Sequence, residues 1–219
     1  MAYKIFQENT SIVIPTCNSK YLKGCIESVK KYTTNYELII ITNNYKGFSW
    51  ACNRGIEQAN NEYICFLNDD TLVTPGWLER LREAFEIPNC GISSPSTCYS
   101  KGKQCNIRIM DKRFKWSRED INRYAQTLKH EIIQTDIYGF CMLTRKSILD
   151  KVGVFDEAYG LGNYEEDDLV YRMKLKSLYP YWVKHSYVHH YGSQTLKNTN
   201  SLLSQNRKLF EAKKNSMGS

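Results

Sequence analysis

The sequence predicts an α/β domain in which a mostly parallel central sheet is flanked by helices. Short apolar runs of strand length alternate with amphipathic runs of helical length through the first half of the chain. The run at 37–41 is almost continuously apolar, as expected of a parallel strand that is covered on both faces. Such sheets bind ligands beyond the carboxyl ends of their strands, so polar residues at those ends are the first candidates for a functional site.

The first half supplies most of the expected sheet. Strands are expected at the apolar runs 11–15, 37–41, 62–67 and 91–95. Helices are expected between them at 20–32, 50–59 and 77–86. In the first helix, Leu22, Cys25, Ile26 and Val29 fall on one face. That apolar face is expected to pack against the sheet.

The second half is less regular. Residues 96–130 are polar, basic and weakly periodic, and no helix or strand is expected there. Beyond them we expect strand structure at 132–145 broken at Gly139, a short helix from Lys146 to Gly153, a helix at 165–177, two short strands at 181–183 and 186–190, and an amphipathic helix at 201–214.

Length and composition are those of one domain of ordinary size, with 219 residues. No apolar stretch approaches the ~20 residues that span a bilayer, and no signal-peptide pattern opens the chain. We therefore expect a cytoplasmic protein, at most peripheral at a membrane. The eight cysteines are scattered without metal-ligand spacing and are expected to be buried free thiols in a reducing compartment.

Two carboxylates, Asp69 and Asp70, follow Asn68 directly after the third expected strand. Their place at a carboxyl end suits a ligand site, and their oxygens suit a hard divalent ion such as Mg²⁺ or Mn²⁺. Asn and Asp are also common turn residues, so a simple strand-ending turn is the alternative.

Four consecutive acids, Glu165 to Asp168, open the helix expected at 165–177. Acids in a first turn are favoured by the helix dipole, which is the structural explanation. Crowded carboxylates also raise one another's pKa values, which favours a general base. His189 and His190 end the last short strand, where neighbouring side chains point to opposite faces. One of them is therefore expected to be buried and the other available as a ligand. His130 and His185 have no supporting motif and are expected at the surface.

Taken in order, these segments resemble the family 2 glycosyltransferases, enzymes of the GT-A fold, from Ser11 to about Thr195. The resemblance is carried by SIVIPTCN, YKGFSWACNRGI, EYICFLNDDTLVTPGWLERL, GFCMLTRKSILDKVGVFDEAYGLGNYEEDDLVYRMK and VHHYGSQT. It implies a metal-dependent, inverting, hexosyltransferase-type enzyme that uses a nucleotide-sugar donor and Mn²⁺ or Mg²⁺. It also implies one domain over 1–219, with a nucleotide-sugar-binding half at 1–95, an acceptor and catalytic half at 96–195 and a C-terminal tail at 196–219.

The resemblance also assigns roles to individual residues. Asp70 is similar to the metal-binding aspartate of the family, and His189 or His190 would complete the metal or phosphate site. Glu166 matches the general base, with Asp167 as the alternative if the register shifts by one. The nucleotide-sugar would contact Pro15, Thr16, Asn18, Asn43, Gly47, Asn53, Asn68 and Asp69. Asn43 stands near the position where the family usually has a base-recognising aspartate, so the choice among UDP, GDP and dTDP is open.

The segment 101–130 holds nine basic side chains against three acidic ones, most of the net charge of +7. It would bind an anionic acceptor, such as nucleic acid, a phosphorylated lipid or an acidic glycan, or form a solvated loop near the donor diphosphate. The basic tail helix would pack on the domain or lie on an anionic membrane. Two other functions fit parts of the pattern: a nucleotidyltransferase, and a degenerate GT-A module that binds nucleotide-sugars without catalysis.

Overall fold

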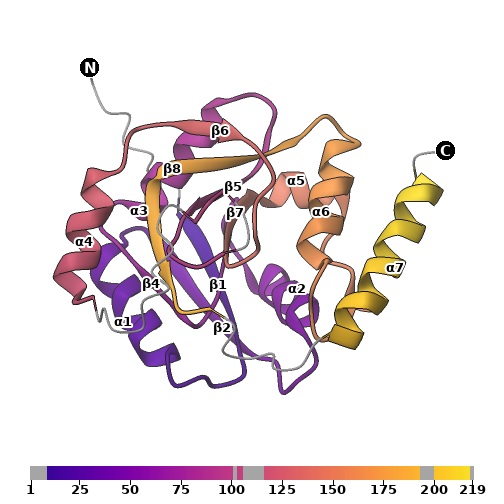
Figure 1. Cartoon of the computed structure of the whole chain (residues 1–219), viewed down its shortest axis with the longest axis horizontal. Coiled ribbons are helices and arrows are strands. Elements are labelled where there is room, and N and C mark those ends of the chain that lie inside the picture. The colour runs from indigo at the N-terminus through magenta and orange to yellow at the C-terminus, as the bar shows by residue number, and fades with distance from the viewer. Residues whose placement is uncertain (1–8, 101–102, 106–115, 193–199, 218–219) are drawn as a thin grey trace.

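The computed structural model describes residues 9–100, 103–105, 116–192 and 200–217. Within these ranges an eight-stranded sheet has the order β2-β1-β3-β7-β5-β8-β4, and β6 pairs with β8 off this path (Figure 1). The strands are β1 (Thr10–Thr16), β2 (Tyr36–Thr42), β3 (Tyr63–Leu67), β4 (Thr71–Val73), β5 (Cys90–Ser96), β6 (Ile132–Gln134), β7 (Cys141–Arg145) and β8 (Tyr179–His190). The helices are α1 (Leu22–Tyr32), α2 (Phe48–Gln58), α3 (Trp77–Glu83), α4 (Arg118–Thr127), α5 (Lys146–Val152), α6 (Glu165–Lys174) and α7 (Asn200–Met217), with short 3₁₀ turns at Ala84–Glu86 and Glu157–Tyr159.

The predicted α/β fold with a mostly parallel sheet is confirmed. The strands β1, β2, β3, β5 and β8 run in one direction, while β7 runs antiparallel between β3 and β5. Strands β4 and β6 pair antiparallel with β8. Because β7 is reversed, its first residues, and not its last, lie at the edge where β1 and β3 end. The Asn68 N–H donates to the Phe140 carbonyl across that edge, at 2.9 Å.

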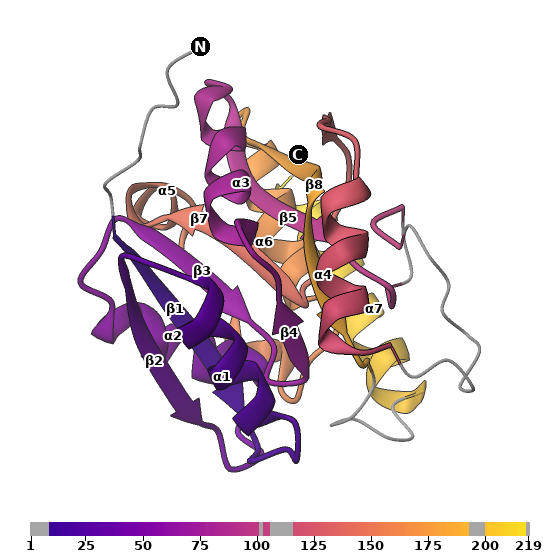
Figure 2. The same ribbon diagram turned by 90° about the vertical axis from the view of Figure 1, so that its left-hand side faces the viewer.

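Both faces of the sheet are covered, which explains its continuous apolar strands. Ile12 and Ile14 of β1 pack on the side of α1 and α3, whereas Val13 packs on the side of α2, α5 and α6. Helix α4 forms a smaller cluster with β4 and β8, in which Ile121 and Ala125 meet Leu72 and Tyr187 (Figure 2). The site described below therefore lies at the ends of two buried strands, β1 and β3, and of the partly exposed strand β2.

Three elements differ from the expectation. The two short strands at 181–183 and 186–190 are one strand, β8, because pairing with β5 continues to Tyr187 and pairing with β4 begins at Val188. Strand β4 was not among the expected strands. Helix α4 lies in the segment expected to be irregular, and its start is fixed by a capping box between Ser117 and Asp120.

The tail helix α7 packs on the domain, which was one of the two arrangements considered from the sequence. Its Phe210 ring lies 5.6 Å from the Tyr164 ring and 6.1 Å from the Tyr171 ring, which places α7 alongside α6 (Figure 1). In the described part of the chain, none of the helices combines the length and apolarity needed to cross a membrane. All eight cysteines are free thiols, and all except Cys17 and Cys105 are buried.

Candidate functional site

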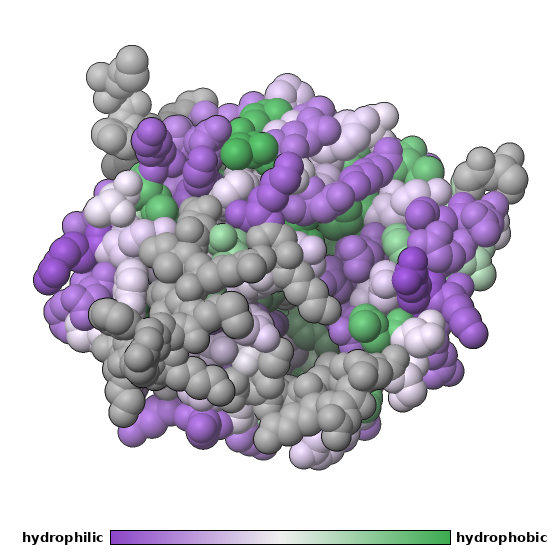
Figure 3. Space-filling view, viewed as in Figure 1, coloured by the Kyte–Doolittle hydropathy of each residue, from purple (hydrophilic) through white to green (hydrophobic). Residues whose placement is uncertain are grey.

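A pocket of about 640 Å³ lies at the edge where β1, β2 and β3 end. Its walls come from both halves of the chain. The carboxyl ends of the three strands contribute Pro15, Thr16, Asn43, Asn68, Asp69 and Asp70. The opposite wall contributes the segment just before β7, the loop 161–164, the first residues of α6, His190 of β8 and Leu203 of α7. The face seen in Figure 3 is largely polar and is hollowed near its centre.

The two aspartates after β3 have different surroundings. The Thr16 hydroxyl donates to Asp69 Oδ2 at 2.5 Å, which ties the end of β1 to the end of β3. Burial raises the pKa of Asp69. Asp70 instead faces His190, and its carbonyl accepts the Tyr191 N–H at 3.0 Å. Asp70 is thus the carboxylate whose oxygens are directed at the end of β8.

His190 is held in the orientation of a metal ligand. Its Nδ1 lies 2.9 Å from the Tyr99 carbonyl oxygen, which can only accept, so Nδ1 carries the ring proton. The other nitrogen, Nε2, lies 3.2 Å from Asp70 Oδ1. A backbone carbonyl that fixes the tautomer in this way is typical of metal-binding histidines.

The spacing of these two ligand atoms also suits an octahedral ion. Neighbouring ligands on Mg²⁺, each ~2.1 Å from the ion, are about 3 Å apart. The 3.2 Å between His190 Nε2 and Asp70 Oδ1 is close to that value. The chemistry of this donor set therefore fits Mg²⁺ or Mn²⁺.

His189 points away from this site. Its Nδ1 lies 3.2 Å from the Cys98 sulfur and 3.5 Å from the Tyr187 hydroxyl. Burial, followed by the charges of His190 and Arg118, lowers the pKa of His189 to about 4. It is not among the residues that line the pocket. The strand alternation predicted from sequence is therefore observed, and it selects His190.

The acids at the start of α6 divide in the same way. Glu165, Glu166 and Asp167 line the pocket, but Asp168 does not. Asp168 accepts a hydrogen bond from Arg172 Nε at 2.9 Å and lies 3.2 Å from Lys213 Nζ. It is 1% exposed and serves as an internal ion-pair partner.

Glu165 is 7% exposed, and one of its carboxylate oxygens, Oε2, is buried without a hydrogen-bond partner among the described residues. Burial, followed by the charge of Glu166, raises its pKa well above the usual range. The Glu166 carboxyl group lies against Gly139, because a Cβ there would be 3.4 Å from Glu166 Oε1. Glu165 therefore holds its proton more tightly than an ordinary glutamate.

The residues expected around the nucleotide are mostly on the pocket wall. Asn43 accepts the Tyr45 N–H at 2.9 Å and the Cys17 thiol at 2.8 Å through Oδ1. Gly47 also lines the pocket. Asn18 and Asn53 do not. Asn18 has φ 59° and donates its N–H to Thr16 Oγ1 at 2.8 Å, so it shapes a turn.

Asn53 is 6% exposed and joins α2 to the segment after α5. Its Nδ2 donates to the Phe155 carbonyl and to Glu157 Oε1, both at 2.9 Å, and its Oδ1 accepts the Phe155 N–H at 3.1 Å. In this arrangement the side chain supports the loop that leads towards α6. It does not reach the pocket.

Sequence reasoning missed several wall residues, namely Tyr99, Tyr138, Phe140, Leu161, Tyr164 and Leu203. They come from irregular segments and from α7, which no local pattern connects to the site. Burial, followed by the charges of Asp167 and Glu166, raises the pKa of Tyr138. This shift agrees with the position of Tyr138 beside the acids of α6.

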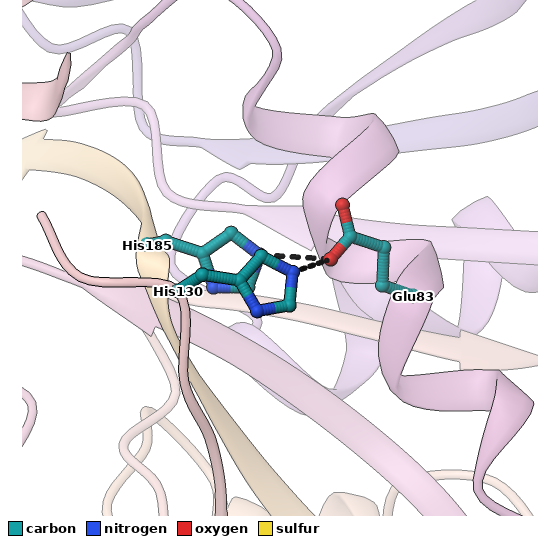
Figure 4. Close-up of side chains that lie close together, drawn as sticks. All are labelled: Glu83, His130 and His185. Atoms are coloured by element: carbon teal, nitrogen blue, oxygen red, sulfur yellow. Dashed lines mark hydrogen bonds and ion pairs between the residues drawn. The ribbon is translucent and has the colours of Figure 1, made fainter. Parts of the chain in front are cut away.

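A second group of metal-ligand types lies elsewhere, at the end of α3. Glu83 Oε2 is 2.9 Å from His130 Nε2 and 2.8 Å from His185 Nε2 (Figure 4). The Glu131 N–H donates to His185 Nδ1 at 3.3 Å, so Nε2 carries the ring proton and donates to Glu83. Its lone pair is not available to a metal ion in this tautomer.

This group therefore acts as a hydrogen-bonded clasp between α3 and β8. The two imidazole rings are stacked at 3.9 Å, and none of the three residues lines the pocket. The expectation that His185 lies at the surface is wrong, since it is 5% exposed. It is buried because its ring stacks against His130 and is hydrogen-bonded to Glu83.

Comparisons with known proteins bear on this geometry. Residues 38–153, just over half of the chain, match the profile of the family described as glycosyl transferase family 2. No curated protein sequence matches the chain. Among solved structures, the crystal structure of GalNAc-T7 with UDP, GalNAc and Mn²⁺ superposes with a TM-score of 0.66 and 12% identity. That alignment covers 92% of this chain and 48% of the other, so the chain spans about half of that protein's length. At this identity the likeness shows the GT-A fold alone.

Proposed function

Because the chain belongs to glycosyl transferase family 2, we propose that it transfers a hexosyl group from a nucleotide-sugar to an acceptor hydroxyl with inversion at the sugar carbon. One observation carries the proposal. Asp70 and His190 lie in the same pocket as Glu165, Glu166 and Asp167, although these residues come from distant parts of the sequence. A cation bound at one side of the pocket and a carboxylate base at the other would together serve a direct displacement.

Asp70 and His190 would hold Mn²⁺ or Mg²⁺. When bound, the ion neutralises the charge that grows on the leaving diphosphate. Asn43, Pro15 and Thr16 would surround the nucleoside. In this proposal residues 1–95 form the donor half of one domain and residues 96–195 the acceptor half.

Glu166 would be the general base. Glu166 lines the pocket, and its carboxyl group lies beside Gly139, where an acceptor hydroxyl would approach. Removing the hydroxyl proton as the oxygen attacks is a role that a positioned carboxylate fills, typically with a ~10²–10⁴-fold effect on rate. Asp167, the next acid on the pocket wall, is the alternative base.

The proposal is tested by incubating the chain with UDP-, GDP- and dTDP-sugars and measuring nucleoside diphosphate release with Mn²⁺ or with EDTA. Release is expected from at least one donor with Mn²⁺ and is expected to stop with EDTA. Glu166→Gln should lower turnover by at least ~100-fold while Mn²⁺-dependent nucleotide binding is retained. Asp167→Asn is the matched control.

Other outcomes have clear meanings. Loss of turnover in Asp167→Asn but not in Glu166→Gln would identify Asp167 as the general base in place of Glu166. Release of a sugar 1-phosphate in place of the nucleoside diphosphate would indicate nucleotidyl transfer instead. Binding without turnover of any donor would leave a nucleotide-sugar-binding module, and the proposed reaction would then be rejected.

A further inference from the structure

The loop directly before α6 has an unusual backbone. Gly160, Gly162, Asn163 and Tyr164 all have positive φ, at 59°, 137°, 74° and 74°. Residues other than glycine rarely adopt positive φ, because the conformation is strained. They are found there when surrounding contacts stabilise it. The loop forms part of the pocket wall and ends at the acids of α6. Whatever holds its backbone also sets where Glu165 and Glu166 lie.

One side of the loop rests on α2. A Cβ built on Gly47 would lie 1.9 Å from the Gly160 carbonyl oxygen, so the loop backbone touches Gly47 directly. This contact prevents the loop from moving into the donor side of the pocket. It does not by itself fix the left-handed residues.

On the other side, the Asn206 side chain of α7 is hydrogen-bonded to the loop backbone. Asn206 is 3% exposed, and its amide nitrogen lies 2.8 Å from the Tyr159 carbonyl, 2.9 Å from the Gly162 carbonyl and 3.1 Å from the Asn163 carbonyl. Carbonyl oxygens only accept, so the atom that they surround must be the NH₂ group. Its two hydrogens serve three carbonyls, and of these the Tyr159 carbonyl also accepts the Gly162 N–H at 3.3 Å.

Other contacts keep Asn206 in place. Phe210, one turn further along α7, packs on Tyr164. Lys213 forms ion pairs with Asp156 and Asp168, which flank the same loop. The neighbouring residues Gln205 and Arg207 are exposed. Asn206 is therefore the residue of α7 that is directed at the loop backbone.

We infer that Asn206 is a positioning residue, which holds the loop 159–164 so that the acids of α6 face Asp70 across the pocket. The inference rests on the proposed function for its catalytic consequence. The C-terminal helix is then part of the active site's construction, although only Leu203 of that helix reaches the pocket wall.

The decisive variant is Asn206→Asp, which keeps the shape of the side chain but replaces the NH₂ donor by an oxygen facing three carbonyls. Gln205→Glu makes the same change of charge at the exposed neighbour and is the control. Displacement of a base by about 1 Å can cost ~100-fold in rate, so turnover by Asn206→Asp should fall by about that factor. Mn²⁺-dependent nucleotide binding should be retained, because Asp70 directly precedes β4 and His190 ends β8, and neither belongs to the loop. The pH profile of turnover should also shift.

Hydrogen exchange gives a readout that does not need catalysis. The amides of residues 160–168 should exchange faster in Asn206→Asp and should be unchanged in Gln205→Glu. If Asn206→Asp does not fold, Phe210→Leu, which weakens the same docking, should show the same pattern to a smaller degree.

Wild-type turnover in Asn206→Asp, or equal losses of nucleotide binding and turnover, would overturn the inference. Unchanged exchange at 160–168 would overturn it as well. An inactive wild-type chain with faster exchange in Asn206→Asp would reject the proposed reaction but leave the role of Asn206 standing.

Discussion

At the scale of single residues, two adjacent histidines have opposite functions because they stand on opposite faces of β8. His190 is fixed by the Tyr99 carbonyl and offers Nε2 to the Asp70 side. His189 is enclosed by Cys98 and Tyr187, and its low pKa keeps it neutral. The sequence could predict this alternation but not which histidine faces the pocket, since strand orientation depends on the pairing with β4.

We predict that His190→Gln weakens Mn²⁺-dependent binding of nucleoside diphosphate at least ~10-fold, because changes to the shell of a metal ligand already cost that much. His189→Gln should leave binding unchanged. Thermal shifts with UDP or GDP and Mn²⁺ measure both, since a ligand at 100 times its Kd stabilises by about 2.7 kcal/mol. Equal loss in both variants would contradict the assignment.

At the scale of elements, periodicity alone was enough to predict α1, α2 and the buried strands of the first half. It could not predict that β8 is continuous or that β4 exists, because both depend on partners far away in the sequence. Helix α4 was missed although the Ser117–Asp120 spacing of its capping box is visible in the sequence. Most of its ten residues are polar, and only Ile121 and Ala125 are buried, so the apolar periodicity was too weak to predict a helix.

The contact between α2 and β1 gives a test at this scale. A Cβ on Gly55 would lie 2.2 Å from Val13 Cγ1, in the fully buried core. Gly55→Ala should therefore lower the free energy of unfolding by about 1–3 kcal/mol, the usual cost of overpacking. Urea denaturation followed by circular dichroism measures the change.

Gly24 in α1 is the matched control, because a Cβ there meets Leu72 at an ordinary 3.6 Å. Gly24→Ala should raise the free energy of unfolding by up to about 1 kcal/mol through the higher helix propensity of alanine. The two identical substitutions should thus have opposite signs. A stabilising Gly55→Ala would show that α2 can move away from β1.

At the scale of the whole molecule, the buried carboxyl group of Glu165 affects stability as a function of pH. Its pKa is raised in the folded chain above the ordinary 4.5, so the unfolded chain releases this proton first as the pH rises. The contribution of Glu165 to the free energy of unfolding is therefore full below pH 4.5 and declines from there upwards.

We predict that Glu165→Gln becomes more stable relative to the wild type as the pH is raised above 4.5, with a slope of at most about 1.4 kcal/mol per pH unit. Urea denaturation without metal at several pH values between 5 and 8 checks this. Glu27→Gln makes the same change at an exposed position of α1 and serves as the control. A difference that does not vary with pH would contradict the prediction.

Only part of the pocket wall could be predicted from the sequence, because the rest of the wall is brought together by the fold of the whole molecule. Asp70, the histidine pair 189–190 and the acids Glu166 and Asp167 could be selected because the resemblance to the family 2 glycosyltransferases gave them roles. Tyr99, Leu161 and Leu203 carry no such chemistry, and their presence on the wall follows from long-range packing. The same is true of Asn53, whose amide serves the fold and not the pocket.

The continuity of β8 has an evolutionary consequence. Successive side chains of a regularly paired strand alternate between faces, so the insertion or loss of one residue between Tyr187 and His189, where β8 pairs with β4, would exchange the two imidazoles. Length changes in this stretch should therefore be tolerated only in pairs. We therefore expect homologues whose residues differ in this stretch to differ in its length only by an even number of residues.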